Sequence, residues 1–223
     1  MAKKIGLKTK TPMPCADPKE RSRTFSEVAL GYTEQMALQE ADRCIMCKNR
    51  PCVAGCPVEI DIPTFIQQMA KSDFQGAFNT MMSKNVLPAI CGRVCPQEEQ
   101  CEKVCNVADT GKYQPVAIGR MERFAADWEA AQGTIEPPVC AAPTGKKVAV
   151  VGAGPAGLTV AGDLLLKGHE ITVFEALHGP GGVLLYGIPE FRLPKAIVEA
   201  EVEYLRKLGV KIETNFVIGR TNS

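Results

Sequence analysis

The sequence predicts a multidomain protein of the α and α/β classes, with an all-helical, cysteine-rich first part and a second part built on a parallel sheet. Three observations lead to this fold class. Eight of the ten cysteines lie between Cys44 and Cys105, among segments with helical periodicity. Prolines and glycines without an apolar period fill residues 133–147. A strand, a glycine-rich turn, a helix and a second strand follow.

The helical signals come first in the chain. Thr33 precedes "EQMALQEADRC" as a candidate N-cap, and Pro63 stands near the start of "DIPTFIQQMAKS", whose apolar residues recur at helical spacing. The segment "DFQGAFNTMMSK" continues this pattern. A further helix is expected to open on Pro115 and to close at Gly133. We therefore expect a helical domain over residues 1–133, a linker over 134–147 and an α/β domain over 148–223.

Length, charge and composition exclude several classes of protein. With 223 residues and 45% apolar content, the chain can bury the core of one to two domains. Its formal charge of +1 and the lack of a long single-sign run argue against nucleic acid or a membrane surface as partner. No apolar run approaches the ~20 residues of a membrane span or forms a secretory signal. A cytoplasmic location is expected, where cysteines more often serve metal or redox chemistry than disulfides.

The eight clustered cysteines have spacings typical of ferredoxins. A cubane cluster needs four ligands that converge from different directions, and three in one loop plus one from a distant segment satisfy this need. Eight thiols would then hold two clusters. The spacings are C-x2-C-x4-C-x3-C-P for Cys44, Cys47, Cys52 and Cys56, then C-x3-C-P-x5-C-x3-C for Cys91, Cys95, Cys101 and Cys105.

Zinc and disulfides are the alternatives for these thiols. A structural zinc site usually shows paired C-x2-C turns, and only Cys44 with Cys47 has that spacing. Buried unreacted thiols or disulfides would leave the ferredoxin-type spacing unexplained. Zinc or clusters could also have only a structural role, in a non-catalytic domain that docks a partner.

The second part carries a dinucleotide-binding pattern. In "VAVVGAGPAGLTVAGDLLLKGHEITVFE", Gly152 permits a tight turn, Gly154 lets the backbone approach a pyrophosphate and Gly157 brings helix against strand. Glu175 ends the next strand, where a carboxylate can accept a hydrogen bond from a ribose hydroxyl. Because a carboxylate repels a 2′-phosphate, NADP is disfavoured at this position, and FAD and NAD remain.

The segments "CIMCKNRPCVAGCPVEIDIPTFI", "PAICGRVCPQEEQCEKVC", "PVAIGRMERFAADW", "VAVVGAGPAGL" and "GGVLLYGIPEFRLPK" together resemble the small (beta) subunit of glutamate synthase. The amino-terminal part of dihydropyrimidine dehydrogenase and NADH-dependent ferredoxin:NADP oxidoreductase are similar as well. The likeness covers roughly residues 24–220. It implies two 4Fe-4S clusters in an alpha-helical ferredoxin-like domain, beside an FAD.

The resemblance also implies the ligands and the flavin contacts. Cys44, Cys47, Cys52 and Cys105 correspond to the ligands of one cluster. Cys56, Cys95 and Cys101 correspond to three ligands of the other, and the oxygen-bearing fourth ligand of the family falls on Glu122. This displaces Cys91, which spacing alone selects and which stays the alternative. The implied FAD contacts are Val94, Gly152, Gly154, Pro155, Ala156, Gly157, Glu175, Gly182 and Arg192.

The implied function is that of an oxidoreductase of the NADPH-dependent glutamate synthase small-subunit type. Electrons would pass from NADPH through FAD and the two clusters to a large glutamate synthase subunit or another electron-accepting subunit. The cofactors would carry the chemistry, so no residue is expected as nucleophile or general base. The family continues beyond "VIGRTNS" with an NADPH-binding domain, so we expect this chain to be a fragment that is inactive alone. A ferredoxin:NADP or sulfur-linked oxidoreductase is the alternative enzyme.

Overall fold

The computed structural model describes residues 6–133 and 139–220, which form two compact units. The first unit comprises Met1–Thr24 and Val28–Ile135, and the second comprises Phe25–Glu27 and Glu136–Ser223. Residues 134–138 of the expected linker lie outside the described residues. In the described ranges, no helix is both long and apolar enough to cross a membrane.

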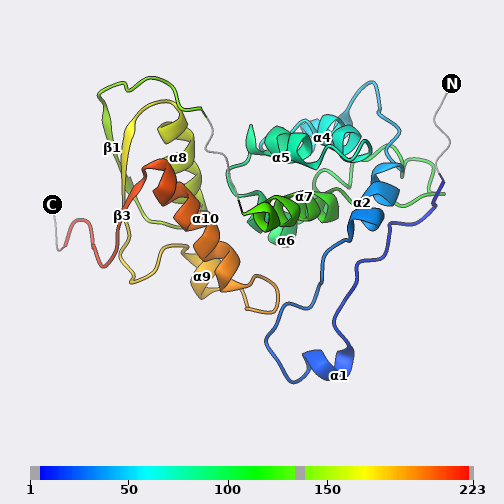
Figure 1. The fold of residues 1–223 in the computed structure, drawn as a ribbon, viewed down its shortest axis with the longest axis horizontal. Helices are drawn as coiled ribbons and strands as arrows, with labels where there is room; N and C mark the ends of the chain where they lie inside the picture. Colours follow the sequence, from blue (N-terminus) through cyan, green and yellow to red (C-terminus); the bar gives the residue numbers. More distant parts are fainter. Residues whose placement is uncertain (1–5, 134–138, 221–223) are drawn as a thin grey trace. The chain divides into compact units, whose positions relative to one another are not determined.

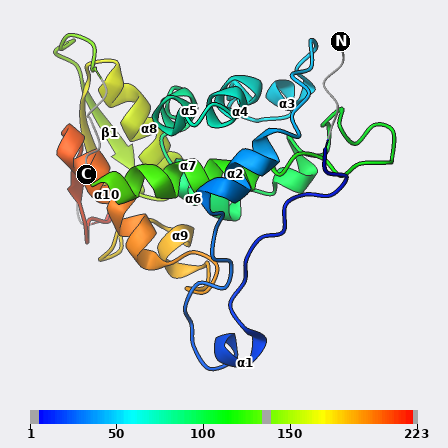
Figure 2. The ribbon, with the colours of Figure 1, turned by 45° about the vertical axis from the view of Figure 1, so that its right-hand side comes forward.

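The first unit is helical (Figure 1). Helices α4 and α5 pack on each other, α5 and α6 pack on α7, and Figure 2 shows α2 against α7. Phe65, Met69, Met81 and Met121 are almost fully buried between these helices. The elements are α1 Pro18–Arg21, α2 Glu34–Ala41, α3 Pro51–Ala54, α4 Ile62–Met69, α5 Phe74–Met82, α6 Pro88–Val94, the 3-10 helix η1 Gln97–Glu99 and α7 Ile118–Gln132.

Side-chain caps explain where several helices begin. The hydroxyl of Thr33 accepts from the N–H of Met36, as its position before α2 predicts. Asp61 and Asp73 cap α4 and α5 in the same way. At the other end of α7, Gly133 adopts a left-handed φ of 70° and closes the helix, as predicted.

The prediction that the last helix opens on Pro115 is wrong, because α7 begins at Ile118. The backbone before it is held by a buried ion pair instead of by helical hydrogen bonds. The N–H of Ala117 donates to Oε1 of Glu40 at 2.8 Å, and the carbonyl of Pro115 accepts from Arg43. Glu40 lies 77 residues earlier in the chain, so local sequence carries no sign of this contact.

The second unit contains a three-stranded parallel sheet of order β1-β2-β3. Val148 pairs with Ile171, and Thr172 pairs with Lys211. Helix α8 connects the first two strands, and α10 packs on α8 (Figure 1). The elements are β1 Lys147–Val151, α8 Pro155–Leu166, β2 Glu170–Phe174, α9 Val183–Tyr186, α10 Lys195–Leu208 and β3 Lys211–Glu213.

Candidate functional site

Four of the clustered cysteines line a first cavity in the helical unit. Cys44 and Cys47 come from the segment after α2, Cys52 from α3, and Cys105 from a segment more than fifty residues later. The other walls are mostly apolar, among them Ile62 of α4, and the void itself measures about 20 Å³. The four residues are the set that the resemblance assigns to one cluster.

Left-handed backbone turns bring the first three of these thiols to one place. Met46, between Cys44 and Cys47, has a φ of 51°, and Arg50 has a φ of 42°. Residues other than glycine rarely adopt these angles, and such strain persists only where the surrounding structure enforces it. A contact of 3.1 Å between Nη1 of Arg50 and Oδ1 of Asp61 fixes the second turn against the start of α4.

The other four clustered cysteines and Glu122 line a second cavity of about 180 Å³. It forms where α6 crosses α7 in close contact. A Cβ on Gly92 would lie 2.5 Å from the backbone nitrogen of Arg123, so only glycine permits this approach. The cysteines of this cavity are Cys56, Cys91, Cys95 and Cys101.

Asn85 joins the two alternative ligands of the second cavity. Its side-chain N–H donates to Oε1 of Glu122 at 3.0 Å, and its Oδ1 lies 3.7 Å from the Sγ of Cys91. The N–H of Leu87 donates to the same Oδ1 and thereby orients the amide. Both Glu122 and Cys91 therefore reach the cavity, on the two sides of one amide. No motif in the sequence singles out Asn85.

Burial makes both cavities costly places for a negative charge. Burial, with smaller contributions from neighbouring thiols and carboxylates, raises the pKa of Cys52 to about 12 and the pKa of Cys95 to about 11. The pKa of Cys101 is raised for the same reason, and burial raises the pKa of Glu122 to about 7 despite the hydrogen bond from Asn85. A bound metal would have to displace protons from these groups.

The metal-free protein should lose stability as the pH rises from about 4.5 to 7. The folded state keeps the proton on Glu122 in this window, whereas the unfolded chain releases it. Each rise in pH within the window therefore stabilises the unfolded chain relative to the folded state. The free energy of unfolding should fall by roughly 3 kcal/mol at most. Urea unfolding at pH 5 and pH 8, followed by the fluorescence of the single Trp128, measures this fall. Equal falls in the unmodified and Glu122→Gln proteins would contradict it.

Among the described residues, no three or more His, Cys, Asp or Glu side chains meet closely enough to hold a single metal ion. The cysteines that line the two cavities carry thiols rather than disulfides. The thiols thus surround two voids and do not converge on a point.

A buried ion pair that the sequence analysis did not identify lies directly before Cys44. Glu40 and Arg43 are at most 1% exposed and are paired with each other. The carboxylate of Glu40 also accepts from the N–H groups of Thr11, at 2.7 Å, and Ala117. Arg43 also donates to the carbonyls of Gln114 and Pro115. The pair thereby ties the residue before Cys44 to two distant segments, around Thr11 and around residues 114–117.

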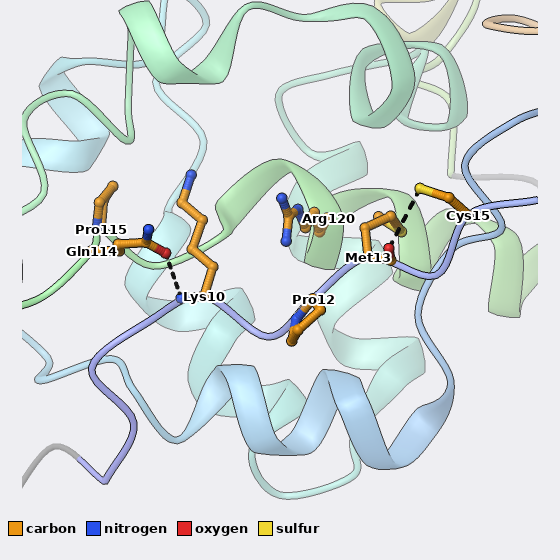
Figure 3. A pocket seen from close by; sticks show the side chains of 7 residues that line it. All are labelled: Lys10, Pro12, Met13, Cys15, Gln114, Pro115 and Arg120. Atoms are coloured by element: carbon orange, nitrogen blue, oxygen red, sulfur yellow. Dashed lines mark hydrogen bonds between the residues drawn. The ribbon is translucent and has the colours of Figure 1, made fainter. Parts of the chain in front are cut away.

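A second missed ion pair stands directly after Cys101. Glu102 is buried, pairs with Lys10 and accepts from the N–H of Gly119 at 3.2 Å. Figure 3 shows the segment that supplies Lys10 crossing the helical unit, with its backbone N–H bonded to Oε1 of Gln114 at 2.9 Å. An open hollow of about 570 Å³ lies beside this segment, and Arg120 on its wall donates to the carbonyl of Thr11.

In the second unit, the glycine-rich turn has the geometry that its spacing predicts. Gly152 has a φ of 95°, and a Cβ on Gly157 would lie 1.9 Å from the carbonyl oxygen of Gly152. At Gly154, by contrast, a Cβ would meet only Cα of Gly182 at 3.9 Å, so open space lies beside the start of α8. Pro155 and Ala156, the other expected contacts here, are exposed in the first turn of α8.

The remaining expected nucleotide contacts lie in different surroundings. Glu175 is buried and accepts from the N–H groups of Ala153, at 2.7 Å, and Leu177, so it holds the glycine-rich turn. Gly182 has a φ of 54°, and a Cβ there would lie 2.8 Å from Cα of Gly154. Arg192 is exposed in the segment before α10. Val94 is the last residue of α6 in the helical unit and is half-buried.

Comparisons with known proteins match both units. Residues 21–134 match the family described as dihydropyrimidine dehydrogenase domain II, 4Fe-4S cluster, and residues 150–198 match an NAD(P)-binding Rossmann-like domain. A helical iron–sulfur domain followed by a Rossmann-like segment defines a class of oxidoreductase subunits. The chain belongs to the dihydropyrimidine dehydrogenase domain II, 4Fe-4S cluster family.

Relatives with curated names agree with this membership. The chain is 40% identical over 197 residues to the NAD-dependent dihydropyrimidine dehydrogenase subunit PreT of Escherichia coli K12, covering 88% of this chain and 47% of that protein. It is 36% identical over 204 residues to the glutamate synthase (NADPH) small chain of Azospirillum brasilense, covering 92% and 42%. These names confirm the resemblance to glutamate synthase small subunits and dihydropyrimidine dehydrogenase. The chain spans about half the length of these relatives.

Proposed function

We propose that this chain carries electrons from a flavin on its Rossmann-like segment, through two 4Fe-4S clusters in its helical unit, to the active site of a partner subunit. One observation supports this above all. Cysteines far apart in sequence surround two separate voids, four at the first and four with Glu122 at the second. The membership of the family and the names of the relatives support the same kind of cofactor.

The arrangement of the thiols favours a cluster over zinc. Zinc ligands meet at about 2.3 Å from one ion, whereas a cubane cluster is a larger body with one ligand at each of four corners. The second void, of about 180 Å³, suits the larger group, whereas at the first, of about 20 Å³, the support is the set of four cysteines that line it. We propose Cys44, Cys47, Cys52 and Cys105 for one cluster, and Cys56, Cys95, Cys101 and Glu122 for the other.

The residues of the chain have distinct tasks in this proposal. When bound, the clusters accept and release single electrons. The cysteine side chains would hold iron between mostly apolar walls. Asn85 orients Glu122, and the Glu40–Arg43 pair fixes the backbone that precedes Cys44. No nucleophile or general base is required, because cofactors supply the redox chemistry.

We assign the flavin to the turn formed by Gly152 and Gly154 at the start of α8. Open space beside Gly154 and the positive end of a twelve-residue helix suit a pyrophosphate. In this proposal NADPH binds to the complete enzyme and reduces the flavin, in keeping with the name of the Azospirillum brasilense relative. Glu175, Gly182, Arg192 and Val94 are the further proposed contacts of the flavin.

Glutamate synthase is the first candidate for the complete enzyme, with a large subunit as partner. The 40% identity to the subunit PreT favours a dihydropyrimidine dehydrogenase as second candidate. The partner's reaction distinguishes the two: NADPH-dependent formation of glutamate supports the first, and reduction of a pyrimidine supports the second.

Counting iron tests the clusters directly. Anaerobically prepared protein should contain about eight iron ions and as many sulfides per chain, with visible absorption that bleaches on reduction by dithionite. Cys52→Ser and Cys101→Ser should each reduce the count to about four, because each removes a ligand of a different cluster. The matched control is Cys15→Ser, which alters an exposed cysteine outside both cavities and should change nothing. Zinc in a colourless protein would contradict the proposal.

A further inference from the structure

Gln100 stands at the wall of the second cavity and is held there by its backbone. Its N–H donates to the carbonyl of Gln97 at 3.0 Å, at the end of η1. A Cβ on Gly55 would lie 3.1 Å from the carbonyl oxygen of Gln100, so the first cysteine segment packs directly on this residue. The main chain of Gln100 is therefore fixed between two segments that carry cysteines.

The side chain of Gln100 points its amide at one particular sulfur. Its Oε1 lies 3.2 Å from the Sγ of Cys95, where the protonated thiol is the donor. Once iron takes the place of that proton, the sulfur can only accept a hydrogen bond. The amide of Gln100 can bond to both forms of Cys95, the protonated thiol and the iron-bound sulfur. Rotation of the amide by half a turn puts a donor N–H where the acceptor oxygen was.

We propose that Gln100 donates an N–H hydrogen bond to the sulfur of Cys95 in the loaded protein, and that this bond raises the reduction potential of the cluster in the second cavity. The inference rests on the proposed function, since it requires Cys95 to be a ligand. One-electron reduction makes a cluster more negative, so an N–H aimed at a ligand sulfur stabilises the reduced form more than the oxidised form.

Other amides around the second cavity already have other partners. The Nε2 of Gln97 donates to the carbonyl of Cys91 at 3.0 Å, and Asn85 donates to Glu122. The amide of Gln100, by contrast, lies within hydrogen-bonding distance of the sulfur of Cys95, a proposed ligand. The first cavity serves as an internal reference, because Gln100 does not line it.

Redox titration of anaerobic protein, followed by EPR, tests the inference. The signal that Cys95→Ser abolishes belongs to the second cavity. Gln100→Leu should make reduction of that cluster roughly tenfold less favourable, a fall of about 59 mV for one electron. Gln100→Glu should lower the potential at least as far, because it brings a carboxylate to the same sulfur. The cluster of the first cavity should keep its potential in both variants.

The possible outcomes separate the two proposals. An unchanged or raised potential in variants that keep about eight iron ions would overturn the role of Gln100 and leave the proposed function standing. Loss of iron from the second cavity in both variants would show a merely structural role and would also overturn it. Unmodified protein without iron at the second cavity would overturn both proposals.

Discussion

Replacement of Glu40 by Leu should lower the free energy of unfolding of the helical unit by about 3–5 kcal/mol. The substitution leaves the guanidinium of Arg43, which is 1% exposed, without its ionic partner in a dry environment. It also removes the acceptor of the Thr11 and Ala117 N–H groups. Both losses arise because desolvated charges and donors have no water to replace a missing partner.

Denaturant unfolding measures this loss, with the fluorescence of Trp128 as a signal confined to the helical unit. Trp128 is the only tryptophan and packs on Phe74, with 5.6 Å between the ring centroids. The matched control is Glu99→Leu, which breaks an exposed pair with Lys103 and should cost less than about 1 kcal/mol. A second variant with both Glu40→Leu and Arg43→Leu should recover part of the loss. Equal effects of Glu40→Leu and Glu99→Leu would refute the prediction.

Gly157→Ala should displace α8 from the glycine-rich turn and destabilise the second unit by about 1–3 kcal/mol. The new Cβ would meet the carbonyl oxygen of Gly152 at 1.9 Å, and backbone atoms cannot yield as a flexible side chain can. Because the same turn forms the proposed pyrophosphate site, retention of FAD should also fall. Hydrogen exchange of the amides in β2 and flavin content measure the two effects.

Gly154→Ala separates binding from folding in the same turn. Its φ of −73° suits alanine, and the new Cβ has 3.9 Å of clearance to Gly182. The exchange rates of β2 should therefore stay unchanged. The methyl group would nevertheless occupy the space that a close approach of the pyrophosphate requires, so flavin content should fall. Normal flavin content in Gly154→Ala would refute the assignment of this turn.

Local signals in the sequence predicted most of the secondary structure. The cap at Thr33, the apolar repeat of α4 and the strand–turn–helix pattern at Gly152 are each decided by residues within a few positions of one another. The predicted start of α7 at Pro115 was wrong because distant residues, not local ones, determine where this helix begins. Glu40 and Arg43 hold residues 114–117 in a non-helical path, and no local pattern indicates a partner so far away.

The residues of the candidate site likewise fall into those that the sequence identified and those that only the structure shows. Spacing selected the eight cysteines, and the resemblance divided them between two clusters. It could not select Asn85, Gln100 or the Glu40–Arg43 pair, because a single amide or an acid and a base three residues apart usually lie on a solvated surface. Glu40, Arg43 and Asn85 matter because they are buried, and Gln100 matters because it lies beside Cys95; both features depend on how distant segments pack.

The path of the amino-terminal segment has a consequence for synthesis on the ribosome. Its bonds to Glu102, Gln114 and Arg120 join residues that are 92 to 109 positions apart. At typical rates of translation, Lys10 waits roughly 5–20 s before its partners leave the exit tunnel. During this delay Lys10 has no partner, so the amino-terminal segment can take its place only after residues 102–120 have been made.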